Sequence, residues 1–98
     1  MAARTRYLLT YDIREPGRLR RVHKVATDFG EPLQYSVFVC DLTDIELVGL
    51  RRALRAEMHL TIDNAALFDL GPATGRGVRC IEFLGPTPEL PTNGPTIW

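Results

Sequence analysis

The sequence predicts a two-layer α+β sandwich, in which two helices cover one face of a mainly antiparallel sheet. Residues 7–13 alternate apolar and polar character with period two, which is the spacing of a half-buried strand. Residues 16–29 and 44–58 repeat apolar side chains at helical spacing. Further extended runs follow each helix, so the order strand, helix, strand, helix, strand, strand favours this fold class.

The first strand separates its side chains into two sets. One face receives Tyr7, Leu9, Tyr11 and Ile13, and the other receives Leu8, Thr10 and Asp12. An aspartate at a strand end is common, but a series of arginines begins two positions later. This combination suggests acid, metal and phosphate chemistry in one place.

A helix is predicted from Pro16 to Phe29. Proline suits the first turn of a helix, and Gly30 supplies a stop at the other end. The apolar side chains recur at helical spacing and so define a buried face. The outer face carries three basic residues, Arg18, Arg21 and Lys24.

The middle of the chain is predicted to contain an extended segment and a second helix. Residues 32–42 alternate as one long bent strand or as two short strands, and the pattern leaves both alternatives open. Thr43 and Glu46 form a capping box, so we expect the second helix from about Asp44 to Met58.

The C-terminal third is predicted to contain two more strands and a tail. Asn64–Leu70 and Gly77–Leu84 are extended runs, separated by a glycine- and proline-containing turn at residues 71–75. We therefore expect one domain over residues 1–85. The proline-rich tail, residues 86–98, is expected to be extended. Trp98 is an anchor against a partner chain or a frayed end.

The formal net charge is zero, but the charge is unevenly distributed. Residues 1–24 contain seven basic and two acidic groups, which gives +7 − 2 = +5. Such a basic patch is compatible with nucleic acid. The chain has eleven arginines and one lysine, a bias that serves bidentate phosphate contacts or reflects GC-rich coding.

The composition also limits the compartment and the cysteine chemistry. No apolar run approaches the roughly 18 residues of a membrane span, and residues 1–6 lead into a strand and not into a signal-peptide core, so we expect a cytoplasmic protein. Cys40 and Cys80 lie in apolar strand patterns, which indicates core thiols in a reducing compartment.

One face of the predicted sheet has no helix to cover it. Leu8, with Phe38 or its neighbours, offers apolar groups to that face, and a small domain rarely leaves such a surface wet. We expect a homodimer that packs sheet against sheet. A twofold axis would then bring the two copies of Asp12 together.

The sequence resembles the small CRISPR-associated endonucleases of the Cas2 family. The matching residues are Tyr11-Asp12-Ile13, Arg18, Arg21, Lys24-Val25, Phe29-Gly30 and Gln34-Tyr35-Ser36-Val37-Phe38. The resemblance implies a ferredoxin-like fold and a homodimer in which a C-terminal strand crosses to the partner. It also implies magnesium-dependent nuclease activity and a scaffold role for the CRISPR integrase during spacer acquisition.

The resemblance assigns roles to several of these residues. Asp12 corresponds to the family's metal-binding and catalytic aspartate, with Mg²⁺ as cofactor, and its alternative role is a hydrogen bond to the next turn. Tyr11 and Phe38 correspond to neighbouring aromatics that stack, form an interface or pack in the core. The chain departs from the family at Val39, often a glutamate, and at Glu31-Pro32, near which an arginine is usual.

Phosphate contacts are expected from the basic surface, namely Arg14, Arg18, Arg21 and Lys24; the alternative is a solvated face. Recognition would follow the backbone of duplex DNA or single-stranded RNA and not its base sequence. A histidine base is not expected from His23 or His59. We therefore rank a DNA-binding scaffold above a metal-dependent nuclease. A ribonuclease toxin of similar fold and a ferredoxin-like regulator without nuclease activity are the alternatives.

Overall fold

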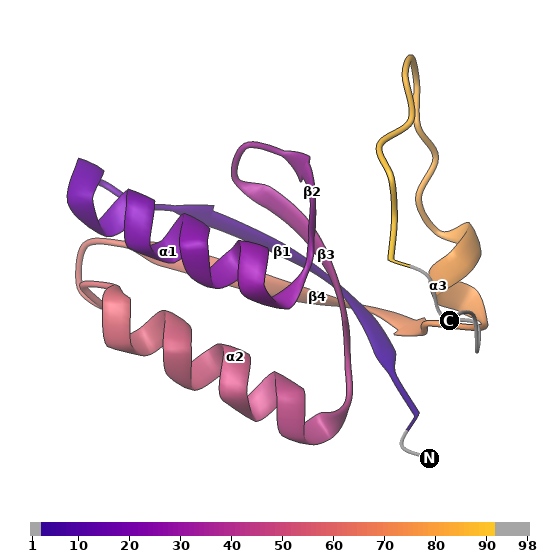
Figure 1. The fold of residues 1–98 in the computed structure, drawn as a ribbon, viewed down its shortest axis with the longest axis horizontal. Helices are drawn as coiled ribbons and strands as arrows, with labels where there is room; N and C mark the ends of the chain where they lie inside the picture. Colours follow the sequence, from indigo (N-terminus) through magenta and orange to yellow (C-terminus); the bar gives the residue numbers. More distant parts are fainter. Residues whose placement is uncertain (1–2, 92–98) are drawn as a thin grey trace.

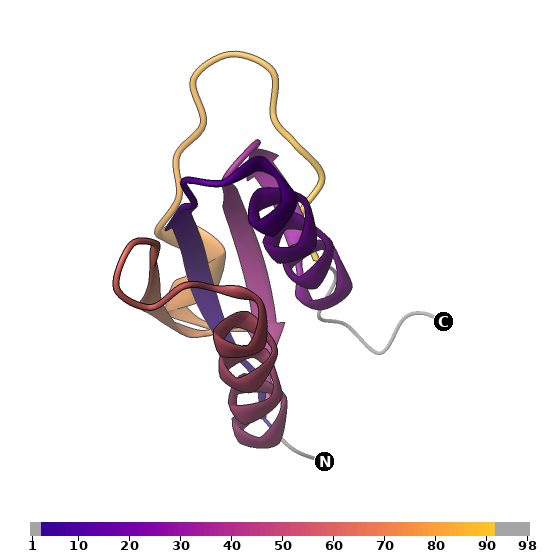
Figure 2. The ribbon, with the colours of Figure 1, turned by 90° about the vertical axis from the view of Figure 1, so that its left-hand side faces the viewer.

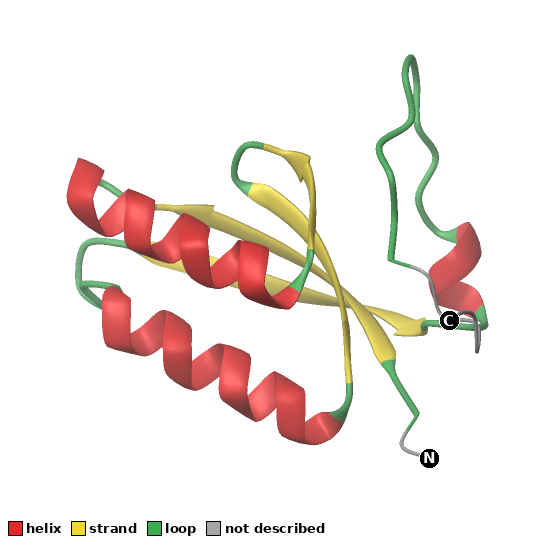
Figure 3. Cartoon of the chain, in the orientation of Figure 1, coloured by secondary structure: helices red, strands yellow, loops and turns green. Residues whose placement is uncertain are grey.

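The structure, a computed structural model, describes residues 3–91 and has a four-stranded antiparallel sheet at its centre. The strand order is β2-β3-β1-β4. Figures 1 and 3 show α1 and α2 side by side on one face of this sheet. The elements in chain order are β1 (Thr5–Asp12), α1 (Pro16–Phe29), β2 (Glu31–Gln34), β3 (Val37–Leu42), α2 (Asp44–Glu57), β4 (Asn64–Pro72) and α3 (Arg76–Arg79). The predicted α+β sandwich is confirmed.

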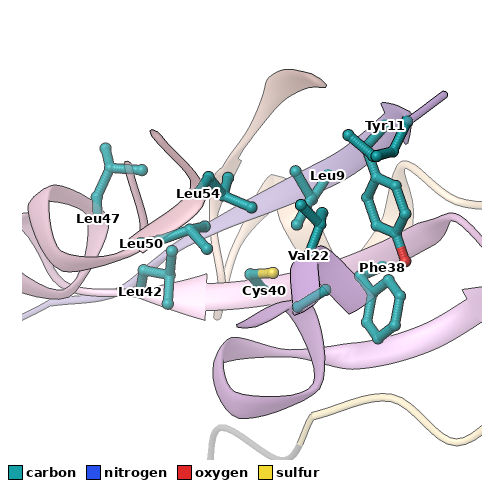
Figure 4. Close-up of a cluster of buried hydrophobic side chains, with 11 residues drawn as sticks. Leu9, Tyr11, Val22, Phe38, Cys40, Leu42, Leu47, Leu50 and Leu54 are labelled. Carbon is teal, nitrogen blue, oxygen red and sulfur yellow. The ribbon is translucent and has the colours of Figure 1, made fainter. Parts of the chain in front are cut away.

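The core lies between the sheet and the two long helices. The alternation of β1 places Leu9 and Tyr11 against this core, where Leu9 has no exposed surface. Helix α1 contributes Val22 and α2 contributes Leu50, both fully buried. Figure 4 shows these side chains converging with Phe38 and Cys40 of β3. Burial of the Cys40 thiol raises its pKa to about 12, so it is an unreactive core residue.

Both long helices begin at side-chain caps. Glu15 caps α1 by accepting hydrogen bonds from the backbone N–H groups of Gly17 and Arg18, at 2.9 and 2.7 Å. Thr43 and Glu46 form the predicted capping box of α2. These acceptors satisfy backbone donors that lack partners inside the helix. No helix in the part of the chain that the structure describes is long and apolar enough to cross a membrane.

The extended segment after α1 forms two strands and not one. β2 and β3 pair with each other and are separated by a turn at residues 35–36. Gly30 leads into β2 in an extended conformation. A Cβ atom there would lie 2.4 Å from the Val39 carbonyl oxygen. Gly30 therefore permits the close approach of α1 to β3, and any side chain would force them apart.

The predicted strand at Gly77–Leu84 is wrong. Residues 76–79 form the short helix α3, and residues 80–91 follow without regular structure. Gly71, at φ +94°, lies next to the last residue of β4, before the turn at residues 73–75. A Cβ on Gly77 would lie 2.8 Å from that of Arg6, so α3 packs tightly over β1. Alternation alone does not make a strand, because a strand also needs a neighbouring strand edge.

The sheet face opposite the two long helices is only partly covered. Figure 2 shows α3 on that side. Side chains from residues 80–88, together with Leu8, Leu33, Val37 and Leu70, line a hollow of about 630 Å³ over this face. Phe38 pairs with Leu9 and faces the helices, so its neighbour Val37 supplies the apolar surface on the open side.

An ion pair lies buried beneath α3. The Arg6 guanidinium donates to both carboxylate oxygens of Asp41, at 2.8 and 2.9 Å. It also donates to the Gly77 and Pro91 carbonyl oxygens, at 3.1 and 3.4 Å. The hydrogen bonds to Asp41 raise the pKa of Arg6. Arg6 thus joins β1, β3, α3 and the end of the described chain.

Candidate metal and nucleic-acid site

Asp12 ends β1 and is exposed to solvent. Its neighbour across the ladder is Asn64 of β4. Within residues 3–91, the Asp12 carboxylate has no hydrogen bond or ion pair, so it does not bond the turn after β1. An exposed carboxylate without a partner is free to take an external cation.

Asp63 holds the turn that follows Asp12. Its buried carboxylate accepts hydrogen bonds from the backbone N–H groups of Arg14 and His59, at 3.0 and 2.9 Å. The Arg18 guanidinium donates two more, at 2.7 and 3.2 Å. The hydrogen bonds from Arg18 have the largest effect on the pKa of Asp63, and the backbone donors have a smaller one. Together they hold this pKa well below its usual range. Asp63 therefore stays ionised and joins the start of α1 to the start of β4.

The sequence analysis missed Asp63 because it assigned residues 59–63 to a simple connection. Arg18, its partner, lies 45 positions earlier in the chain. No local spacing rule links two residues so far apart. The only available signal was an aspartate directly before a predicted strand, which is common in turns.

The predicted basic surface is largely paired within the chain. Arg18 is committed to Asp63, since its side chain is 20% exposed and that of Asp63 is fully buried. Arg21 pairs with Glu57, and Lys24 pairs with Asp28, but both pairs are exposed. Exposed ion pairs stabilise a protein by only about 0.2–1 kcal/mol. Arg21 and Lys24 can therefore exchange their carboxylate partners for phosphates. Arg18 cannot do so without leaving the buried Asp63 carboxylate unpaired, which would destabilise the fold.

Arg14 occupies the position between Asp12 and α1. Its backbone N–H is bound to Asp63, but its exposed side chain has no ion pair in the described part of the chain. Arg14 is thus the predicted cation nearest in sequence to Asp12. The fold brings Asp12 and Arg14 to one end of the sheet, whereas Arg21 and Lys24 lie farther along α1.

The predicted aromatic residues lie on the other face of the sheet from Asp12. Phe38 has no exposed surface and Tyr11 is 5% exposed. The Tyr11 hydroxyl donates to the Tyr35 carbonyl oxygen at 3.2 Å and lies 3.0 Å from His23 Nδ1. Burial raises the pKa of Tyr11 to about 12. These side chains pack in the core of this chain, and Trp98 lies outside the described residues.

The donor set for a metal is small. Within residues 3–91, no three histidine, cysteine, aspartate or glutamate side chains gather as a metal site. His23 stacks on Tyr35 with ring centroids 5.0 Å apart. The His59 ring bonds Thr61 at 2.9 Å. Asp12 is thus the one predicted ligand that the chain brings to the candidate site.

A comparison with protein families assigns this chain to a known family. The model of the family described as CRISPR associated protein Cas2 matches residues 5–74, from the start of β1 to the turn after β4. The chain belongs to the Cas2 family.

Curated relatives agree with this assignment. A CRISPR-associated endoribonuclease Cas2 of Rhodospirillum rubrum is 34% identical over 95 residues, which cover 92% of this chain and 97% of the relative. A CRISPR-associated endoribonuclease Cas2 of Nitratidesulfovibrio vulgaris is 35% identical over 95 residues, covering 92% and 90%. The Cas2 similarity thus extends beyond the residues that the family model matches.

Solved structures show the same fold. The crystal structure of Streptococcus pyogenes Cas2 has a TM-score of 0.69 and 33% identity, and it covers 82% of this chain and 99% of that one. A hypothetical protein of Thermus thermophilus has a TM-score of 0.76 and 27% identity, covering 90% and 99%. The predicted Cas2 resemblance is confirmed, and these findings do not favour the toxin or the regulator.

Proposed function

We propose that this Cas2-family chain is a cytoplasmic, homodimeric scaffold that holds nucleic acid for the CRISPR integrase during spacer acquisition. The family match over residues 5–74 carries the proposal. The open face of the sheet supports a homodimer, because Leu8, Val37 and the half-exposed Phe68 offer apolar surface there. A small domain gains stability when a second copy covers such a face.

The nucleic-acid contacts of the scaffold fall on Arg14, Arg21 and Lys24. These side chains are exposed, and their existing ion pairs are weak or lacking within residues 3–91. Each cation that neutralises a phosphate of duplex DNA steepens the log–log salt dependence of binding by roughly 0.9. A homodimer would double that contribution. Arg18 has a different role, since it positions the start of α1 through Asp63.

Magnesium binding is assigned to Asp12. Mg²⁺ usually takes one or two carboxylates and completes its octahedron with water and phosphate oxygens. The exposed carboxylate fits this requirement, especially if a twofold axis brings the second copy's Asp12 close. When bound, the ion would supply Lewis-acid activation of water for phosphodiester hydrolysis. Asp12 would orient the ion, while Arg14 would hold a substrate phosphate.

Nuclease activity is the second candidate function. The unpartnered Asp12 favours it, and the relatives from R. rubrum and N. vulgaris are named endoribonucleases. Against a strong nuclease, no histidine base is predicted, and the rings of His23 and His59 are engaged by Tyr35 and Thr61. Hydrolysis would then be slow, so we rank the scaffold role first.

Binding experiments test the scaffold role. The wild-type protein and the variant R14A/R21A/K24A are titrated with labelled duplex DNA over a range of salt concentrations. We expect wild-type binding to weaken with salt, and the variant to show a slope that is shallower by roughly 0.9 for each phosphate it no longer neutralises. The control is Arg20→Ala, an exposed arginine on the same helix. Equal slopes for wild type and the triple variant would refute the proposed surface.

Cleavage assays separate the two functions. Wild type and Asp12→Ala are incubated with duplex DNA and with single-stranded RNA, in Mg²⁺ or in EDTA. Cleavage that requires both Mg²⁺ and Asp12 would establish a nuclease. If neither protein cleaves but both still bind the duplex, the results would support the scaffold role and not the nuclease role.

A further inference from the structure

Helix α2 carries arginines that the candidate site does not use. Arg51, Arg52 and Arg55 are exposed, and within residues 3–91 none of them has an ion pair or a side-chain hydrogen bond. The three predicted cations of α1 are all paired. A basic residue in the last turn favours the helix dipole, which accounts for Arg55 but not for the cluster. Among the described residues of the two long helices, α2 therefore carries three unpaired arginines, whereas α1 carries one, Arg20.

Two of these arginines border an apolar hollow. A depression of about 210 Å³ lies where α2 ends and β4 passes beside it. Leu54, Met58, Leu60 and Leu67 line it, together with Arg51 and Arg55. Leu54 is buried, whereas both arginines are exposed, so the cations lie at the outer boundary of the hollow.

Exposed aliphatic side chains extend this surface along α2. Ile45 is 84% exposed and Val48 is 51% exposed. They are three residues apart on the helix, and Val48 is followed three residues later by Arg51, so these side chains are neighbours on one side of α2. Leu60, 63% exposed, continues the apolar surface beyond the helix. Arginine and aliphatic groups thus alternate on a surface that no described element covers.

We propose that this α2 surface, defined by Ile45, Val48, Arg51, Arg55 and Leu60, binds an acidic segment of the CRISPR integrase. An apolar side chain of that segment enters the hollow, and its carboxylates pair with Arg51 and Arg55. The inference rests on the proposed scaffold function and adds the surface through which the scaffold receives its protein partner.

The composition of the surface favours a protein segment over nucleic acid. A phosphate backbone needs cations but gains nothing from exposed leucine, isoleucine and valine. Protein interfaces place an apolar anchor in a pocket and surround it with polar contacts, in which arginine is enriched. The charge is complementary to an acidic segment, because no described acidic group pairs with Arg51 or Arg55.

The experiment measures binding of the purified integrase in the absence of nucleic acid. The variant Arg51→Glu/Arg55→Glu reverses the charge of the α2 surface, and Leu60→Asp adds a charge at the hollow. The matched control is Arg20→Glu/Arg52→Glu, which reverses two exposed arginines that lie outside the hollow and away from the open sheet face. Thermal melts confirm that each variant is folded.

We expect Arg51→Glu/Arg55→Glu to weaken integrase binding by at least about tenfold and Leu60→Asp to weaken it several-fold. The control should stay within about twofold of wild type. Added salt should weaken wild-type binding more than binding of the double variant.

Three results would overturn the inference while leaving the scaffold role intact. One is wild-type integrase affinity in both α2 variants. Another is that the α2 variants lose duplex DNA binding but keep integrase binding, which would make α2 a phosphate surface. A third is that they lose only the homodimer, since a second copy of the chain would then occupy the hollow. If the wild-type protein does not bind integrase at all, the scaffold function itself fails.

Discussion

Asp12 and Asp63 lie at neighbouring strand ends, yet their carboxylates have opposite surroundings. Asp12 pairs with Asn64 across the β1–β4 ladder, so Asp63 is one residue from that partner. Asp63 is buried and accepts four hydrogen bonds, whereas Asp12 is exposed and has no partner in the described chain. A carboxylate whose oxygens are all occupied organises the fold, and one whose oxygens are open is available to a ligand.

A third aspartate extends the comparison and gives the largest expected effect. Asp41→Ala leaves the buried Arg6 guanidinium without its carboxylate. Breaking a buried ion pair from one side usually costs about 3–5 kcal/mol. We expect a loss of unfolding free energy of about that size in urea denaturation. The double variant Arg6→Met/Asp41→Leu should be less destabilised than Asp41→Ala, because it leaves no unpaired buried charge. Equal stability of Asp41→Ala and wild type would contradict the role of this pair.

Asp63→Ala should have the next largest effect. It leaves the Arg14 and His59 backbone donors and the Arg18 guanidinium without their acceptor. We expect the melting temperature to fall by on the order of 10 °C. Asp12→Ala is the matched control and should change it by no more than about 2 °C. Similar melting temperatures for the two variants would remove the distinction between the carboxylates.

Acid should weaken the structural carboxylates selectively. Hydrogen bonds lower the folded-state pKa of Asp63, Glu15 and Glu46 below the ordinary values of 3.8 for aspartate and 4.5 for glutamate. Their contribution to stability is therefore full above about pH 4.5 and is lost as the pH falls below these ordinary values toward the lowered ones. Melting temperatures measured from pH 7 to pH 3 should fall.

The matched variant for the acid experiment is Asp63→Asn. It removes the most strongly perturbed carboxyl, so its melting temperature should be lower at pH 7 but should decline less between pH 5 and pH 3. Parallel curves for this variant and wild type would show that Asp63 does not contribute to acid sensitivity.

The sequence predicted what depends on neighbours along the chain. The period-two run at Tyr7–Ile13 and the capping box at Thr43 and Glu46 act over a few residues, so the helices and the first strand were placed correctly. Contacts between distant segments could not be predicted in this way. Asp63 receives Arg18 from 45 positions away, and Gly77–Leu84 alternates like a strand but pairs with no strand in the described structure.

The candidate site was predicted unevenly for the same reason. Alternation along β1 alone put Asp12 on the face opposite Tyr11, and the structure agrees. The basic surface was predicted from spacing on one helix, which could not show that Arg18 is bound to Asp63, or that Arg21 and Lys24 have carboxylate partners. Phe38 is buried because its cross-strand neighbour is Leu9, a register that depends on how β1 and β3 pair.

The smallest expected effect concerns Asp12 and the homodimer. If a twofold axis holds the two Asp12 carboxylates about 4 Å apart, they repel by roughly 4 kcal/mol at an effective dielectric constant near 20. Asp12→Asn should then tighten the dimer by at least about tenfold in EDTA, as measured by sedimentation equilibrium. In Mg²⁺ the difference from wild type should shrink, because the cation offsets the repulsion in the wild-type dimer alone. A dimer affinity that responds to neither the substitution nor Mg²⁺ would place the two carboxylates far apart. Each subunit would then have to bind the metal through its own Asp12 and water.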